Sequence, residues 1–398
     1  ETGNDNILDS DGDPDYYPYQ TLYGLGYKNG SEAGAYFTVI ANPSLKWETQ
    51  ISTDIALEFG LFDRLTGTIE YFKKDSKDLL FDVSQPASVG VTSIIQNIGK
   101  VTNSGVEIEL DYNAFKNKDW SVSVGANATF VKNKIKNLPA TMKENGYISG
   151  SKKWLEGKSI YEFWLRQWHG VDPQTGDGLY VADVSKYNQG NIGTGDGNIT
   201  QSQFDEYKKT VVTIDGKELT NSYTYAKYDF SGSSIPDVYG GFNVRVSYKN
   251  FELAAVFSYQ LGGQILDTNY ATMMSMTEFG YAQSPDLLKA WKQAGDITEV
   301  PRIDNSAAHT TNIGQSYSTR WLTSSDYLNL RSVTIGYQLP KTWLSKVMLK
   351  SARLNLTAEN LFMLKARQGL NPMANYSGVT YNEYMPSRNI TLGLNVSF

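Results

Sequence analysis

Apolar and polar residues alternate with a period of two along much of the chain. The last ten residues give the clearest case, because small or polar residues stand between the apolar ones there. The apolar positions are Ile390, Leu392, Leu394, Val396 and Phe398. Successive side chains of a strand point to opposite faces, so this pattern predicts a strand with one apolar face.

The same alternation recurs upstream and predicts an all-β protein. The stretches that carry it are 51–59, 101–115, 120–130, 242–248, 251–259, 333–337 and 354–358. Two weaker candidates lie near 160–169 and 178–183, which makes about eleven predicted strands. Aromatic residues make up 13% of the chain, which also favours β-structure.

Short and long connections largely alternate between these predicted strands. The short ones are 61–64, 116–118 and 249–250, and the long ones are about 75–100, 133–159, 184–236, 263–324 and 364–385. Long loops of this kind are unusual in a compact domain, whereas outer-membrane barrels have short periplasmic turns and long outer loops. The pattern therefore predicts a transmembrane antiparallel β-barrel, with residue 46 on the outer side and Phe398 on the periplasmic side.

The cost of placing charge in hydrocarbon decides which face of each strand meets lipid. We expect the apolar positions to face the bilayer and the charged positions to line the lumen. The expected luminal residues are Glu58, Glu107, Glu109, Asp111, Arg245, Arg353 and Glu359. The alternative is a β-sandwich in which two apolar faces cover each other.

Composition removes several classes of function. The 398 residues contain no Cys and only two His, and their formal net charge is −6. Thiolate metal sites are therefore excluded, and a nucleic acid is not the expected partner. No apolar run approaches the roughly 20 residues of a membrane-spanning helix.

No stretch of the chain predicts catalysis or a cofactor. Glu107 and Glu109 share a strand face, but they fit a solvated polar lining better than an acid–base pair. Asp9–Asp15 and Gly195–Thr200 resemble parts of calcium loops, although neither has the full spacing. We therefore predict that the chain is not an enzyme and needs no cofactor, with calcium in these loops as the remaining alternative.

Clusters of aromatic residues are the best ligand candidates, because aromatic faces stack on sugar rings or hold apolar peptide side chains. Loop packing, or a place in the aromatic girdles at the membrane surface, is the alternative role for each of them. The candidate substrate contacts are Tyr16, Tyr17, Tyr19, Trp154, Trp164 and Trp168.

Several segments resemble, in order along the chain, the SusC/RagA-like TonB-dependent transporters. They are Asn42–Glu48 (NPSLKWE), Tyr71–Leu80 (YFKKDSKDLL), Asn97–Glu107 (NIGKVTNSGVE), Gly240–Phe242 (GGF), Tyr248–Leu253 (YKNFEL), Asp326–Pro340 (DYLNLRSVTIGYQLP), Glu359–Phe362 (ENLF) and the final Phe398. Each match alone is modest, but together and in this order they are specific.

The resemblance implies the C-terminal half of a barrel that has 22 strands in the family. Residues 1–45 would be an extracellular loop and strand region, and residues 46–398 the barrel part with long extracellular loops. The last strand, from Ile390 to Phe398, would serve as the barrel-assembly signal. We expect the plug, the TonB-contacting segment and the other strands to lie outside these residues, since Glu1–Asn4 lacks the features of a signal peptide.

The resemblance also implies a function and its partners. The expected function is TonB-dependent import of oligomeric nutrients, either glycan oligosaccharides or peptides, across a Bacteroidetes-type Gram-negative outer membrane. The expected partners are a SusD-like surface lipoprotein, TonB and outer-membrane lipid, with no nucleic acid. The alternative function is a soluble or secreted β-sandwich that binds carbohydrate.

Overall fold

The computed structural model describes residues 20–84, 93–194, 197–275, 282–304, 317–344 and 349–398, together with residues 88, 91, 280, 306, 309 and 313. The chain divides into two compact units. Unit 1 comprises Glu1–Ser149, Lys153–Tyr161 and Gly240–Lys249, and unit 2 comprises Gly150–Lys152, Glu162–Tyr239 and Asn250–Phe398. Each unit is described on its own.

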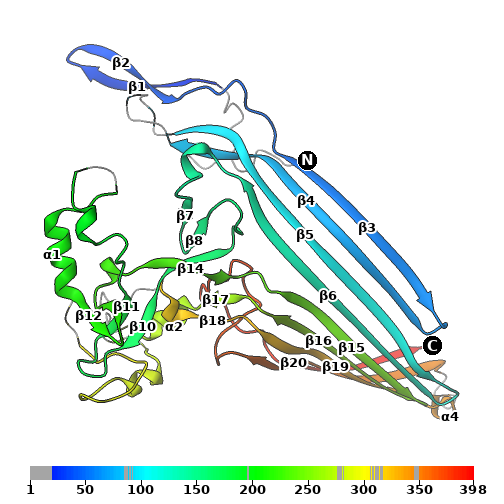
Figure 1. The fold of residues 1–398 in the computed structure, drawn as a ribbon. Coiled ribbons are helices and arrows are strands. Elements are labelled where there is room, and N and C mark those ends of the chain that lie inside the picture. Colours follow the sequence, from blue (N-terminus) through cyan, green and yellow to red (C-terminus); the bar gives the residue numbers. More distant parts are fainter. Residues whose placement is uncertain are drawn as a thin grey trace. The chain divides into compact units, whose positions relative to one another are not determined.

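Unit 1 is built on long antiparallel strands, drawn in blue to green in Figure 1. Their order in the sheet is β15-β6-β5-β4-β3. The bounds are β3 Thr49–Leu61, β4 Leu65–Ser84, β5 Ser93–Lys116, β6 Trp120–Asn137 and β15 Val238–Tyr248. A separate hairpin is formed by β1 Leu22–Asn29 and β2 Glu32–Val39, and shorter elements are η2 Ala140–Met142 and β7 Tyr147–Ser149.

Strand register places the alternating apolar residues of unit 1 side by side. Leu57 pairs with Ile69, Ile69 with Ile108, and Ile108 with Ala128. Residues that pair across neighbouring strands form a row. The rows that begin at Leu61, Phe59 and Ile55 of β3 also bring apolar side chains together. One face of the sheet therefore carries a continuous apolar band, which begins at the tight turn after Leu61.

Unit 2 contains a second set of long antiparallel strands in the order β21-β20-β19-β16. Their bounds are β16 Phe251–Leu261, β19 Tyr327–Gln338, β20 Ser351–Lys365 and β21 Asn389–Ser397. The short helix α4, Lys341–Leu344, lies in the connection between β19 and β20.

The long connections of unit 2 have secondary structure of their own. Short strands form small sheets, one of them with the order β10-β11-β13-β12 and another containing β9 and β14. The strands are β9 Glu162–Arg166, β10 Trp168–Val171, β11 Gly178–Val181, β12 Val211–Ile214, β13 Lys217–Thr220, β14 Tyr228–Ser233, β17 Gln264–Leu266 and β18 Leu322–Ser324. The helices are α1 Gln201–Thr210, α2 Thr268–Met273, η3 Gln189–Asn191, η4 Tyr223–Tyr225, η5 Pro285–Lys289 and η6 Thr319–Trp321. Residue Lys152 of β8, Lys152–Trp154, pairs with Phe163 of β9.

Among the described residues, two hydrophobic cores hold these connections together. One is centred on the fully buried Phe163, Leu165 and Leu266, which pack with the buried ring of Trp321. The other contains Tyr187, Ile199, Phe204 and Tyr207 around helix α1. The connections are therefore packed structures and not open loops.

The structure corrects the predicted number of strands and both ends of the predicted connection 75–100. Among the described residues, nine strands make up the long ladders, where about eleven were predicted. The weak strands near 160–169 and 178–183 exist, but they pair within the small sheets of the connections. Most of the predicted connection 75–100 belongs to β4 and β5, whose pairing continues to Ser84 and Ser93.

The β-sandwich alternative is wrong. A sandwich would bury Ile390, Leu392 and Leu394 against a second sheet, whereas their exposed fractions are 73%, 69% and 62%. Large apolar side chains along β3 are exposed in the same way. Among the described residues, no helix is both long and apolar enough to cross a membrane.

Candidate functional site: the polar strand face and the packed connections

The polar face of unit 1 carries a cluster of carboxylates, which was predicted from the alternation. Register aligns Glu58 with Thr68 and Thr68 with Glu109, while Asp111 pairs with Thr66 one row away. These side chains line a hollow of about 550 Å³. No ion pair joins the three carboxylates to a described cation, so the hollow offers unpaired acceptors to a hydroxyl-rich or cationic ligand.

Three of the family-like segments meet in unit 1. The side chain of Asn97 donates to the carbonyl oxygens of Lys46 at 2.7 Å and of Asp78 at 2.8 Å, and accepts from the Lys46 amide at 2.9 Å. Lys46 and Asp78 also form an ion pair at 3.0 Å. Asp78 has a φ of 57° at an irregularity of the β4–β5 ladder, which explains why this point needs side-chain hydrogen bonds.

In unit 2 the side chain of an arginine lies over a glycine of the neighbouring strand, on the polar face of the sheet. Glu252 pairs with Gly336 and Gly336 with Asn355 on adjacent strands. The Arg353 guanidinium lies over Gly336 and donates to Glu252 at 2.8 Å and to Asn355 at 2.7 Å. A Cβ at position 336 would come within 2.5 Å of the guanidinium, so the glycine leaves room for this ion pair. Arg353 thus lies on the face predicted to be luminal.

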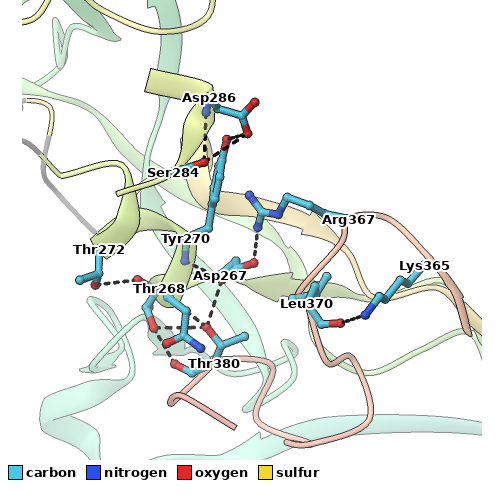
Figure 2. A network of polar contacts seen from close by, with 11 residues as sticks. Asp267, Thr268, Tyr270, Thr272, Ser284, Asp286, Lys365, Arg367, Leu370 and Thr380 are labelled. Atoms are coloured by element: carbon cyan, nitrogen blue, oxygen red, sulfur yellow. Dashed lines mark hydrogen bonds and ion pairs between the residues drawn. The ribbon is translucent and has the colours of Figure 1, made fainter. Parts of the chain in front are cut away.

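A polar network fixes the connections of unit 2 around helix α2 (Figure 2). Asp267 caps the helix by accepting from the Tyr270 amide at 2.9 Å, and it forms an ion pair with Arg367. The Arg367 guanidinium also lies 3.5 Å from the centroid of the Tyr270 ring. The Tyr270 hydroxyl donates to Asp286 at 2.8 Å, and Thr268 donates to the Thr380 carbonyl at 2.5 Å. The network therefore ties the segment after β20 to the segment after β17.

Burial and hydrogen bonding shift the acidities within this network. Burial raises the pKa of Tyr270, and the carboxylate of Asp286 adds to that rise. Hydrogen bonds from Lys289 and Tyr270 lower the pKa of Asp286. The network thus keeps a neutral phenol next to an ionised carboxylate over a wide pH range.

A second group of contacts pairs cations with aromatic rings. The Arg320 guanidinium lies 4.7 Å from the Trp168 ring centroid and 4.3 Å from that of Trp321, and it donates to the carbonyl of Ile313 at 3.1 Å. Burial lowers the pKa of Arg320 to about 10. Arg166 makes similar contacts, 4.9 Å from the Tyr223 ring and 4.7 Å from that of Tyr228.

Unit 2 also contains a small polar cavity of about 140 Å³. Its polar lining includes Ser234, Gln260, Gln264, Ser325, Tyr327 and Asn375. Sites for drug-sized ligands usually have about 300–1,000 Å³. The cavity is therefore too small for an oligomer.

The structure places the aromatic substrate candidates in packed positions. Trp154 contacts the rings of Phe81 and Tyr147, with centroids 6.0 and 5.4 Å apart. Trp164 packs on Tyr228 and Phe230, and Trp168 on Tyr180. All three tryptophans remain partly exposed, so substrate contact stays a prediction for them. Tyr16, Tyr17 and Tyr19 lie outside the described residues.

The calcium hypothesis also stays a prediction. Asp9–Asp15 and the positions 195 and 196 lie outside the described residues. Within the part of the chain that the structure describes, no group of three or more His, Asp or Glu side chains could hold a metal ion. Thr200, at the end of the second candidate loop, instead caps helix α1 by accepting from the Gln203 amide at 3.2 Å.

Sequence reasoning missed the network around Asp267 and the core beneath it. Its members are far apart in sequence, so no local pattern joins Asp267 to Arg367. Only the cap of η5 has a local signal in the sequence, because Ser284 stands directly before Pro285 and its hydroxyl accepts from the Asp286 amide at 3.2 Å.

Long antiparallel strands with an exposed apolar band on one face and carboxylates on the other define a β-barrel of the membrane-spanning type. Comparison with known families agrees, because residues 12–191 match the family described as "TonB dependent receptor-like, beta-barrel". The chain resembles this family over that stretch, and relatives named SusC and RagAB are similar to it over most of its length. The predicted fold class and resemblance are thereby confirmed.

Individual relatives support the same assignment. TonB-dependent receptor P3 of Formosa agariphila is 29% identical over 97% of this chain and 38% of its own length. TonB-dependent receptor SusC of Bacteroides thetaiotaomicron is 24% identical over 90% of this chain and 32% of its own. A solved structure of the RagAB peptide importer in the closed-closed state has a TM-score of 0.73 and 25% identity, covering 97% of this chain and 39% of that one.

The chain thus spans less than two fifths of the length of these relatives. Their names are those of receptors and importers and not of enzymes, in agreement with the prediction that the chain is not an enzyme.

Proposed function

We propose that the chain is the barrel part of a SusC-like transporter that imports oligomeric nutrients across a Gram-negative outer membrane by a TonB-dependent mechanism. The observation that carries the proposal is the combination of an apolar band on one strand face with a carboxylate-lined hollow on the other. Such a wall separates lipid from an aqueous passage.

The packed connections support a binding role at the end of the barrel that carries them. Binding sites are commonly formed by loops that a rigid scaffold positions. The Asp267–Arg367 ion pair and the core around Phe163 and Leu165 give these connections a defined shape. Trp154, Trp164 and Trp168 present partly exposed aromatic faces that suit sugar rings or apolar peptide side chains.

We propose glycan oligosaccharides as the first substrate class and peptides as the second. The glycan assignment rests on the aromatic residues, whereas the likeness to RagAB, which is named a peptide importer, favours peptides. A SusD-like surface lipoprotein would bind over the connections, and TonB would act through a part of the receptor outside these residues. The C-terminus would lie on the periplasmic side.

Uptake by cells that carry the complete receptor tests this function. We expect labelled oligosaccharides or oligopeptides to enter receptor-containing cells, and an uncoupler that collapses the inner-membrane proton gradient to stop their entry. Competition between unlabelled glycan and peptide mixtures identifies the substrate class. Uptake that persists without the gradient, or partition of the receptor into the aqueous phase without detergent, would contradict the proposal.

A further inference from the structure

The outward face of unit 1 changes character abruptly beyond the apolar band. Ile55, Tyr71, Val106 and Phe130 form the last apolar row across β3 to β6. The next row is Thr53, Lys73, Ser104 and Lys132, and the row after it is Ile51, Asp75, Thr102 and Lys134. On every strand, the first of these rows is two residues away from the last apolar row and the second is four residues away. Their side chains therefore point to the same face as the apolar band.

The lengths of the strands explain this change. A β-strand that crosses a bilayer needs about 9–11 residues. β4 has 20 residues and β5 has 24, so both continue well past the hydrocarbon. The row with Lys73 and Lys132 therefore marks the level of the lipid head groups at the end of the strands that carries the long connections.

The lysines of this surface outnumber its acids. Asp75 takes part in ion pairs with Lys73 at 3.3 Å and with Lys100 at 3.9 Å, and it accepts from the Thr102 hydroxyl at 2.6 Å. The hydrogen bond from Thr102, together with the two lysines, keeps the pKa of Asp75 below its usual value. Lys132 and Lys134 are exposed and form no ion pair with any described residue. One carboxylate thus faces four ammonium groups.

We propose that Lys73, Lys100, Lys132 and Lys134 form a docking surface for the phosphorylated head groups of lipid A in the outer leaflet. Continuity with the apolar band places the acyl chains beside Val106 and Phe130 and the phosphates beside the lysines. Ammonium groups at this depth attract anionic lipid, and Lys side chains extend readily toward head groups. This inference rests on the proposed function for the identity of the membrane and the leaflet.

Lipid A binding to the complete receptor in detergent tests the proposal. Native mass spectrometry with lipid A, dephosphorylated lipid A, phosphatidylcholine and inorganic phosphate gives an apparent Kd for each. We expect lipid A to bind more tightly than the other three. Each Lys→Gln substitution should weaken its binding about fivefold, and the Lys132→Gln/Lys134→Gln double variant should do so about 25-fold.

Lys74→Gln is the matched control, because Lys74 follows Lys73 on the same strand but points to the opposite face. It should leave lipid A binding unchanged. Equal loss in Lys74→Gln and Lys132→Gln, or equal affinity for lipid A and its dephosphorylated form, would overturn the inference. Tight binding of inorganic phosphate alone would overturn it as well, since that would indicate a free-anion site.

Uptake measured in parallel separates this inference from the proposed function. The double variant should still import substrate, because its lysines do not face the lumen. A receptor that binds lipid A through these lysines but imports nothing would contradict the proposed function only. A receptor that imports normally but has no phosphate-dependent affinity for lipid A would contradict this inference only.

Discussion

The strands of unit 1 and the connections of unit 2 differ in what surrounds their apolar side chains. Leu165, on strand β9 of the connections, has an exposed fraction of 0%, whereas Leu57, on strand β3, has 63%. Both are strand leucines, yet only Leu165 has a protein core around it. The strands therefore depend on lipid and on backbone pairing, while the connections depend on a hydrophobic core of the kind found in water-exposed domains.

The largest expected effect compares these two leucines. Leu165→Ala should destabilise the connections by about 2–5 kcal/mol, because it leaves a cavity in a packed core. Leu57→Ala should change the free energy of local opening little, since it removes contacts with lipid and leaves no internal cavity. Hydrogen exchange of the complete receptor in lipid measures both. If the two variants lost similar amounts of hydrogen-exchange protection, the distinction between lipid-facing strands and core-packed connections would be contradicted.

Adjacent residues on β5 test which face meets lipid. Ile108→Arg should destabilise the folded barrel by about 2–4 kcal/mol, because it places a charge in the hydrocarbon. Glu109→Arg introduces the same side chain one residue further on, facing the polar hollow, and should be tolerated. The fraction of receptor that folds into lipid vesicles, read from the gel shift on heating, checks the pair. Equal folding of both variants would mean that the two faces are not distinct.

The network around helix α2 allows a smaller test within the connections (Figure 2). Arg367→Leu leaves the buried Asp267 carboxylate without its cation and should cost about 1.5–3 kcal/mol. Lys289→Leu removes a solvent-exposed partner of Asp286 and should have a much smaller effect, because water screens this pair. Limited proteolysis between residues 366 and 388 reports the difference. Equal cleavage rates would show that the buried pair does not hold this segment.

A pH dependence set by Lys152 gives a further test within the connections. Burial lowers the pKa of Lys152 to about 7, against the attraction of Glu162, and its ammonium lies 3.1 Å from the Phe163 ring centroid. The unfolded chain, with a lysine pKa near 10.5, binds more protons between these two values. The stability of the connections should therefore rise from about pH 7 to pH 10.5, by up to about 1.4 kcal/mol per pH unit. Lys152→Met should remove this slope in hydrogen-exchange measurements, and an unchanged slope would assign it to other groups.

Alternation in the sequence predicted the membrane-facing parts of the long strands because lipid on one side and water on the other impose a period of two. It failed from Lys73 to Asp78, where both faces of the hairpin are polar. The strands continue there, but the pattern that identifies them stops. The weaker strands near 160–169 and 178–183 were counted with the barrel strands, whereas they pair within the small sheets of the connections.

The site was less predictable than the fold. Period two alone placed Glu58, Glu109 and Asp111 on one face, and the structure brings them around one hollow. The ion pair of Asp267 with Arg367 joins residues 100 positions apart, and no local rule links them. No local pattern predicts why position 336 is a glycine either. A side chain there would collide with the guanidinium of Arg353, which lies on the neighbouring strand.

Accessibility of single spin labels along β5 tests most directly whether hydrocarbon and water lie on opposite faces of the wall. This chain has no Cys, so a label can be placed at each position from 106 to 112 in turn. In lipid bilayers, labels at 106, 108, 110 and 112 should collide mainly with dissolved oxygen. Those at 107, 109 and 111 should collide mainly with a water-soluble nickel reagent. A profile without a period of two, or one in which the even positions favour the nickel reagent, would contradict a membrane-spanning wall.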